Sequence, residues 1–406
     1  MKPNRQTMLN PASEAELGEA VQRAYRFGRK LRVVGNGSRE GLGNPVDANQ
    51  ILSVSALKGV SLYEPAALTL VASAGTPLRE LEKILLAEGQ HLPFEPADLS
   101  GLLDNKSEPT IGGTVATGLS GPRRIQAGAV RDGLIGVRFV DGTGTIIKNG
   151  GRVMKNVTGY DLVKLMCGSY GTLGVLTELS FKLLPRPETA AVLRFQGLTD
   201  HDAVAALCGA LISPYDITGA AHLRKGKNGA PVTMIRVEGF EASVKYRSQK
   251  LQDLLRQHGE AEIETDQARI AALWKGIRDV ETFHGKAGAV WRLSLRPSSS
   301  PKIVEEIARQ LELEVLYDWG GGLVWLLVPE EIDAGAAAIR QTVNKYGGHA
   351  TLVRANEAVR KSVGAFHPQP TALEALSEGL RQKFDPGGVL NPSIMRRSGS
   401  QMARAV

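Results

Sequence analysis

Hydrophobic residues recur at helical and strand spacings along the first part of the chain. Apolar positions at three- and four-residue intervals predict a helix over 12–28. A short apolar run predicts a strand over 31–34 that ends in a glycine turn. A second strand over 68–72 also ends in a glycine turn, and a helix over 77–88 follows it. This part therefore begins with two strand–turn units that can each present main chain to a ligand.

Glycine is concentrated in residues 109–174, which hold 15 of the 46 glycines in 66 of the 406 positions. Glycine permits φ > 0 and close approach of another group to the main chain. We therefore expect a ligand to be held by backbone in this region. The alternative interpretation is a loop-rich β meander with many turns.

The pattern changes after Pro185-Arg186-Pro187, which is typical of a linker. The predicted strands are 191–196, 231–238, 289–295, two around Gly320-Gly321-Gly322, and 349–354, and the predicted helices are 200–212, 241–258, 267–280, 301–311 and 332–346. This order predicts an α+β domain with an antiparallel sheet covered on one face by helices. A last helix over 371–384 leads into Asp385-Pro386.

The composition is that of an ordinary folded protein, with 42% hydrophobic and 22% charged residues. The net charge is +7, but the basic residues are spread out and only 5% of residues are aromatic. A nucleic-acid partner is therefore not expected. The first residues contain no apolar signal-peptide core, and no apolar run is long enough to span a membrane. We expect a cytoplasmic location, with peripheral attachment to the inner face of the cell membrane left open.

Cysteine and histidine are too scattered for an obvious metal site. Cys167 and Cys208 lie far apart, so the chain cannot form an iron–sulfur cluster or a Cys-based zinc site of its own. None of the seven histidines lies within seven residues of another. No bound metal is therefore expected, although distant residues could still converge.

Four segments carry the candidate chemistry. Gly35-Asn36-Gly37-Ser38 follows a strand and could offer a nest of backbone N–H groups to a pyrophosphate, with a simple turn as the alternative. Position 40 is Glu, so the third glycine of a Rossmann fingerprint is missing. The other three segments are PTIGGTVATG at 109–118, GRVMKNVTGYDL at 151–162 with GSYGTLGVLT at 168–177, and DPGGVLNP at 385–392.

In this order, the four segments resemble the PCMH-type FAD-binding domain shared by vanillyl-alcohol oxidase, D-lactate dehydrogenase and the glycolate oxidase flavin subunits. The resemblance is closer still to the second, smaller flavoprotein subunit of bacterial glycolate oxidase, through Met154-Lys155-Asn156 and Asp318-Trp319-Gly320-Gly321 among others. The family resemblance covers about residues 12–187 and the last thirty, and the subunit resemblance runs more thinly through the middle.

The resemblance implies a domain organisation. The expected parts are a two-subdomain FAD-binding domain at 1–187, an α+β cap domain at 188–370, a C-terminal helix and Asn-Pro segment at 371–396 that packs back on the FAD domain, and a disordered tail at 397–406.

The resemblance also implies which residues bind FAD. Those near the phosphates and flavin edge are Gly35, Asn36, Gly37, Ser38, Gly112, Gly113, Thr114 and Thr117, with Gly75 and Gly118 counted among them. Those along the rest of the cofactor are Arg131, Asp132, Thr158, Gly159, Asp161, Gly174 and Val175, with Asn391 at the isoalloxazine end. Ser38 stands where some relatives carry a histidine bonded to the flavin, so non-covalent FAD is expected.

Oxidation of a 2-hydroxy acid needs a cation for the carboxylate, a base for the hydroxyl proton and the flavin to take the hydride. Catalytic relatives are expected to use a histidine pair, a Glu-His dipeptide and often a metal, and this chain has no Glu-His dipeptide. The remaining candidates are Arg123 and Arg124, with a solvated pair as the alternative. His349 and His367 are further candidates, with ordinary surface or loop histidines as the alternative.

The leading hypothesis is an FAD-binding subunit of a multi-subunit glycolate oxidase that acts on glycolate and related 2-hydroxy acids. Its expected partners are a sister FAD-containing catalytic subunit and an iron–sulfur subunit. One alternative is a self-sufficient FAD-dependent 2-hydroxy-acid dehydrogenase. The other is a structural subunit whose flavin site contributes only stability.

Overall fold

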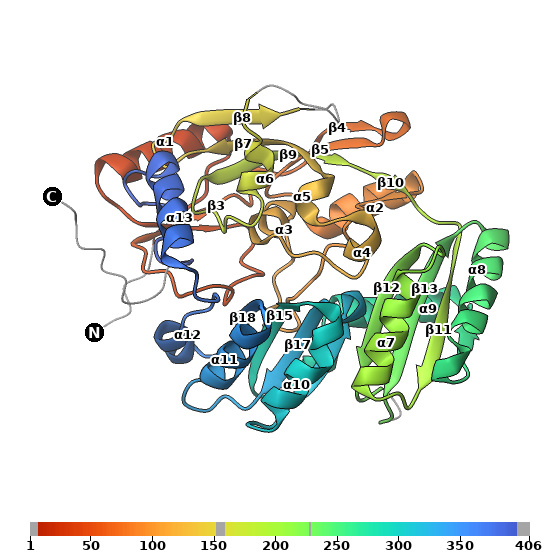
Figure 1. The fold of residues 1–406 in the computed structure, drawn as a ribbon. Helices are drawn as coiled ribbons and strands as arrows, with labels where there is room; N and C mark the ends of the chain where they lie inside the picture. The colour runs from red at the N-terminus through yellow and green to blue at the C-terminus, as the bar shows by residue number, and fades with distance from the viewer. Residues whose placement is uncertain (1–6, 152–158, 227–228, 396–406) are drawn as a thin grey trace.

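Two lobes make up the molecule and meet along a broad boundary (Figure 1). The computed structural model describes residues 7–151, 159–226 and 229–395. The N-terminal lobe contains two main sheets with helices α1 to α6, and the C-terminal lobe contains one large sheet with helices α7 to α11. This is the mixed helix-and-sheet architecture that the sequence predicts.

The first sheet of the N-terminal lobe is parallel and three-stranded. Its order is β1 (Thr7–Leu9), β3 (Gln50–Ser53), β2 (Leu31–Val34). Helix α1 (Glu14–Arg26) buries Leu17 and Val21, whose four-residue spacing places them on one face. The predicted helix over 12–28 and strand over 31–34 are therefore confirmed, with the helix two residues shorter at each end.

The second sheet is antiparallel, in the order β4 (Val60–Glu64), β5 (Thr69–Ser73), β9 (Val175–Lys182), β7 (Leu134–Val140), β8 (Ile146–Gly150). The helices of this lobe are α2 (Leu78–Ala87), α3 (Ile111–Thr117), α4 (Arg124–Ala127), α5 (Val130–Gly133) and α6 (Leu162–Met166). Phe94, Phe139 and Phe181 are fully buried in its core. The described part of the glycine-rich stretch is thus a mixture of strands, short helices and turns. The strand that follows it, β9, lies at the centre of the sheet.

The C-terminal lobe is an eight-stranded antiparallel sheet. Its order is β14 (Glu262–Glu264), β11 (Thr189–Gln196), β13 (Val232–Gly239), β12 (Ile217–Leu223), β16 (Glu314–Asp318), β17 (Leu323–Val328), β15 (Ala289–Leu295), β18 (Gly348–Arg354). The strands β12 and β14 are absent from the sequence-based prediction. The small residues Gly219, Ala220 and Ala221 give β12 no strand-like alternation of polar and large apolar side chains. A larger residue would not fit at position 219, because the ring of Trp274 occupies the space beside it.

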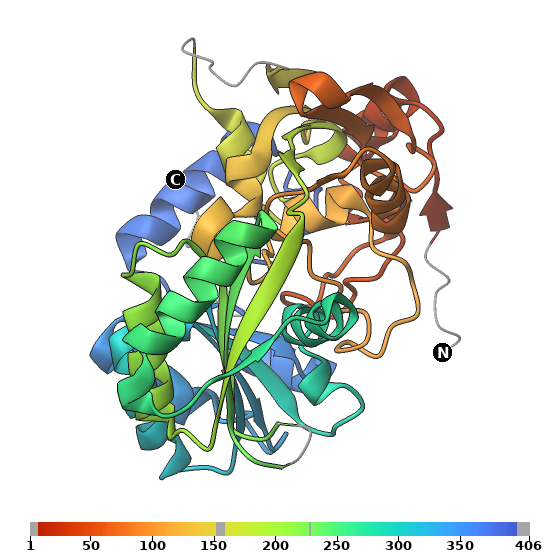
Figure 2. The same cartoon turned by 90° about the vertical axis from the view of Figure 1, so that its right-hand side faces the viewer.

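One face of this sheet is covered by helices, as predicted. They are α7 (Asp200–Leu211), α8 (Glu241–Leu254), α10 (Ser300–Ala308) and α11 (Ala336–Tyr346). Figure 2 shows α8 and α9 (Gln267–Arg278) on different sides of the strands. The opposite face packs, together with α9, against Leu99 and Leu119 of the N-terminal lobe. This second face therefore forms the lobe boundary.

The C-terminal segment returns to the N-terminal lobe. After α12 (Glu357–Val363), helix α13 (Thr371–Phe384) lies beside that lobe (Figure 1). Leu390 then forms a parallel bridge with Leu31 of β2. The predicted helix over 371–384 is confirmed, and the predicted tail over 397–406 lies outside the described residues. Within the described part, no helix is both long and apolar enough to cross a membrane.

Candidate functional site

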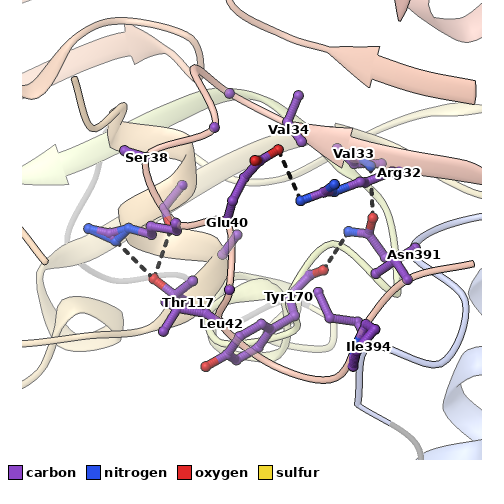
Figure 3. Close-up of a pocket in the computed structure, with 18 of the residues that line it drawn as sticks. Arg32, Val33, Val34, Ser38, Glu40, Leu42, Thr117, Tyr170, Asn391 and Ile394 are labelled. Atoms are coloured by element: carbon purple, nitrogen blue, oxygen red, sulfur yellow. Dashed lines mark hydrogen bonds and ion pairs between the residues drawn. The ribbon is translucent and has the colours of Figure 1, made fainter. Parts of the chain in front are cut away.

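A cavity of about 370 Å³ opens between β2, the loop that follows it, helix α3 and the returning C-terminal segment (Figure 3). Residues far apart in the chain line it, among them Ser38, Thr117, Tyr170 and Asn391. Main chain and small side chains form much of its wall. That composition suits a ligand that binds through backbone groups.

The loop after β2 needs its glycines. Gly37, Gly41 and Gly43 have φ of +80°, +100° and +75°, which L side chains rarely adopt. Gly35 lies so close to α3 that a Cβ atom there would come within 2.4 Å of Thr110 Oγ1. Arg360 of α12 fixes the loop by donating to the carbonyls of Gly41 and Gly43 at 3.0 and 3.2 Å.

Thr110 and Asn391 hold the walls in place. The Thr110 hydroxyl accepts from Gly113 N at 3.2 Å and so caps the start of α3. The Asn391 side chain accepts from Val33 N at 2.7 Å and donates to Tyr170 O at 2.7 Å, as Figure 3 shows. Asn391 therefore lines the cavity, while both ends of its amide are occupied by backbone.

Arg39 places a partly buried positive charge, with a buried Nε, beside this cavity. It donates to Thr117 Oγ1 at 3.2 Å and to Thr114 Oγ1 at 3.1 Å, but its Nε finds no partner among the described residues. Burial lowers the pKa of Arg39 to about 10, so it stays charged at neutral pH. A buried cation with an unused N–H fits an anionic group such as a pyrophosphate.

The structure brings together part of the predicted FAD set. The predicted residues that line the 370 Å³ cavity are Gly35, Asn36, Gly37, Ser38, Gly113, Thr117 and Asn391. Behind this wall, Thr114 bonds Arg39, and Gly75 and Gly112 pack so tightly on backbone that a Cβ atom would come within 2.1 Å of Val54 O and 2.6 Å of Ala74 O.

Other predicted residues lie elsewhere. Val175 is in the core of β9, and a Cβ on Gly174 would come within 2.6 Å of the Phe139 ring. Arg131, Asp132, Gly159 and Asp161 are exposed, and Asp161 caps α6 by accepting from Lys164 N at 3.2 Å. Thr158 lies outside the described residues.

A second cavity of about 180 Å³ adjoins the first. It is lined by Gly118, Phe366 and Arg292 and shares Leu42, Thr117 and Tyr170 with the larger cavity. Arg292 is on β15 of the C-terminal lobe, and Thr117 is on α3 of the N-terminal lobe. The smaller cavity therefore lies on the lobe boundary.

Arg292 is a partly buried cation that lies over aromatic rings. Its Cζ lies 5.3 Å from the ring centre of Trp319 and 6.0 Å from that of Trp325. Among the described residues, no carboxylate forms an ion pair or hydrogen bond with it, and Asp318 acts on it only through space. Burial lowers the pKa of Arg292 to about 10, so it too remains charged at neutral pH.

Asp318 leaves much of this charge uncancelled. Burial is the main cause that raises the pKa of Asp318 to about 7, and the nearby Glu95 raises it further. The uncharged form of this carboxyl is therefore favoured relative to that of an exposed aspartate. The 180 Å³ cavity is consequently positive on its Arg292 side.

The four catalytic candidates from the sequence do not line this second cavity. Arg123 pairs with Glu238 at 2.7 Å, and Arg124 stacks on Trp319 at 4.3 Å. His349 is exposed. His367 is buried with Nδ1 bonded to Ala350 N at 3.2 Å and Nε2 bonded to Asn344 at 2.8 Å, which leaves no ring nitrogen for a substrate. Within the described ranges, no group of three His, Cys, Asp or Glu could hold a metal.

Arg292 and Arg39 are the residues that sequence reasoning missed. Alternation in β15 indicates that Arg292 points away from Trp291 and Leu293, which pack under the helices. Periodicity does not reveal that the opposite face meets a cavity of the other lobe.

Comparison with known proteins agrees with this architecture. Residues 6–150 match the family model described as "FAD binding domain". The chain is 36% identical over 378 residues to glycolate oxidase subunit GlcE of Escherichia coli (strain K12), covering 93% of this chain and 95% of that protein. It is 25% identical over 422 residues to the mitochondrial D-2-hydroxyglutarate dehydrogenase of Rattus norvegicus, covering 95% of this chain and 77% of that protein.

A solved structure of alkyldihydroxyacetonephosphate synthase has the same fold. It superimposes with a TM-score of 0.68 at 18% identity, covering 95% of this chain and 75% of that one. At this identity the likeness concerns the fold alone.

Proposed function

The chain belongs to the FAD-linked oxidase family, and we propose that it is the FAD-binding subunit of a glycolate oxidase that acts on small 2-hydroxy acids. The observation that carries the proposal is the pair of adjoining cavities. One is walled by backbone and a buried cation, and the other presents Arg292 without an acidic partner in the described chain. The first suits a dinucleotide, and the second suits a small carboxylate.

FAD would lie in the larger cavity without a covalent bond. The Gly35–Ser38 loop would receive the pyrophosphate, with Arg39 supplying the opposing charge. Ser38 offers no nucleophile of the histidine type for attachment to the flavin. The close approach of Gly35 to Thr110 supports this role, because any side chain there would displace the wall.

The residues of the second cavity would bind and orient the substrate. Arg292 would take the carboxylate through its N–H groups, because a guanidinium matches carboxylate geometry. The walls formed by Leu42 and Phe366 would exclude water from the bound acid. Bound FAD supplies the hydride acceptor for oxidation of the hydroxyl-bearing carbon. The cavity of about 180 Å³ supports small acids over large ones.

A complex is proposed because the chain lacks parts of an electron-transfer chain. Cys167 and Cys208, the two cysteines, are free and distant in sequence. An iron–sulfur relay would therefore come from a partner subunit, and a sister flavin subunit would hold the fuller catalytic set. We propose a cytoplasmic location, with peripheral attachment to the membrane through the complex.

Anaerobic titration with glycolate tests the proposal. The co-purified complex and the isolated FAD-loaded chain are titrated in parallel while flavin absorbance is recorded. Bleaching of this subunit's flavin in the complex supports the proposal, and bleaching in the isolated chain instead supports a self-sufficient dehydrogenase. A purified chain that binds no flavin, or whose flavin never changes redox state in the complex, contradicts it.

Arg292→Met sharpens the same experiment. Loss of a charged hydrogen bond of about 1.5–3 kcal/mol corresponds to roughly 10–150-fold in kcat/KM for glycolate. Arg194→Met is the matched control. Arg194, on β11, pairs with the exposed Glu262 at 3.4 Å and does not line the 180 Å³ cavity. Equal kcat/KM values of the two variants for glycolate would contradict a substrate-binding role of Arg292.

A further inference from the structure

Trp319 joins the two lobes beside the 180 Å³ cavity. Its indole Nε1 donates a hydrogen bond to the carbonyl of Gly121 in the N-terminal lobe at 3.0 Å. The side chain is almost completely buried. Trp319 therefore contacts the segment that leads into α4 while its backbone belongs to the C-terminal lobe.

The backbone of Trp319 is held in an uncommon conformation. Its φ is 52°, in the left-handed region that bulky residues seldom adopt. Asp318 accepts its N–H at 2.7 Å, and Gly320 and Gly321 follow at φ of 65° and 98°. This tight turn at the end of β16 directs the indole toward the lobe boundary.

Two guanidinium groups lie over the indole. The Cζ of Arg124, from the N-terminal lobe, is 4.3 Å from the ring centre, and the Cζ of Arg292 is 5.3 Å from it. A buried arginine needs compensation for lost hydration. A carboxylate would provide it by accepting N–H bonds, and would then compete with an incoming anion. An aromatic face stabilises the cation without accepting those bonds in the guanidinium plane.

We propose that Trp319 is a positioning residue for Arg292: its ring holds the guanidinium toward the 180 Å³ cavity with the N–H donors available, and its bond to Gly121 fixes that cation relative to the N-terminal lobe. This inference rests on the anion-binding role of Arg292 proposed above. It explains why the rings beside this arginine include a strained tryptophan, while Asp318 acts on it only through space.

Oxalate, a small dicarboxylate without a hydroxyl group to oxidise, is the probe. Its Kd is measured by isothermal titration calorimetry on the full-length, FAD-loaded chain. Trp319→Met keeps apolar volume but removes the aromatic face, and we expect its Kd to rise roughly 5–30-fold, the range for a desolvated cation–π contact. Trp319→Phe retains a weaker aromatic face and should lie between, about 2–4-fold above wild type.

Trp274→Met is the matched control at the same lobe boundary. The Trp274 ring stacks on Arg236 at 4.5 Å, and neither residue lines the 180 Å³ cavity. This variant should lower Tm and leave the oxalate Kd unchanged. A Kd that rises as much as in Trp319→Met would mean general loosening of the boundary and would overturn the proposal.

Arg292→Met separates this inference from the proposed function. If it loses oxalate binding while Trp319→Met binds like wild type, only the positioning role is overturned. If Arg292→Met itself binds like wild type, the anion site fails and the positioning role fails with it. Should Trp319→Met not fold, a wild-type Kd in Trp319→Phe overturns the proposal.

Discussion

Glu95→Gln should strongly destabilise the protein, because Glu95 is a largely buried carboxylate that joins the two lobes. Arg236 of β13 donates to both of its oxygens at 2.9 Å, and Arg123 N donates at 2.7 Å. The Glu95 and Arg236 side chains are only 18% and 4% exposed. Removal of the charge deprives Arg236 of its bidentate partner and leaves it Glu238, whose carboxylate lies 3.3 Å from its Nε, so we expect the low end of the about 3–5 kcal/mol that breaking a buried pair costs.

The pKa of Glu95 gives a similar magnitude. Burial alone would raise it, but the charge and hydrogen bonds of Arg236, with Arg123, outweigh burial and lower the pKa to about 2. Lowering this pKa from the ordinary 4.5 to about 2 corresponds to about 3 kcal/mol. Because the folded-state pKa is depressed, this contribution is complete above pH 4.5 and is lost as pH falls toward 2.

Guanidinium unfolding at pH 7, followed by circular dichroism, measures the effect. Glu305→Gln is the control, since Glu305 pairs with Arg309 at 2.7 Å while both side chains are more than half exposed. That change should cost about 0.5 kcal/mol. Equal losses in the two variants at pH 7, or a gap that does not narrow between pH 4.5 and 2, would refute the reasoning.

Three further outcomes are expected. Burial, and then the charge of Arg123, lower the pKa of His91 to about 4, so the free energy of unfolding should be unaffected by His91 above pH 6.5 and should fall as pH drops toward 4. His91→Gln should therefore flatten the profile of Tm against pH between 6.5 and 4. A profile identical to that of the wild type would contradict this role of His91. Gly35→Ala should weaken FAD binding more than tenfold in a fluorescence titration, because the new Cβ would come within 2.4 Å of Thr110 Oγ1. The control is Gly379→Ala, which lies in open space on α13. It should raise the free energy of unfolding by about 0.5–1 kcal/mol and leave FAD affinity unchanged. Asn391→Ala breaks the bonds to Val33 N and Tyr170 O and should lower the free energy of unfolding by about 2 kcal/mol in a denaturant titration; wild-type stability and FAD affinity would show that this clamp is dispensable.

The sequence allowed the layers to be predicted because their signals are local. Helix α13 and strand β2 follow from a few neighbouring apolar positions, and both have the predicted bounds. The parts that escaped prediction depend on partners distant in sequence. Arg236 lies 141 residues from Glu95, and Arg123 lies 115 residues from Glu238, so no spacing rule connects them.

The site was predicted unevenly for the same reason. Glycines report local backbone demands, which is why Gly35 and Gly37 were singled out and line the cavity. An arginine within a strand has no such signature. Arg292 becomes informative only when the fold places it against Tyr170 of the other lobe, with aromatic rings as its neighbours.

The return of the C-terminal segment sets an order for biosynthesis. Asn391 closes onto Val33 across 358 residues of sequence, and Leu390 bridges to Leu31. On the ribosome, β2 emerges long before the residues that complete its side of the dinucleotide cavity. Cofactor capture would therefore be postponed until the segment around Leu390 and Asn391 has been translated. Flavin retention would then distinguish chains that contain this segment from chains terminated before it.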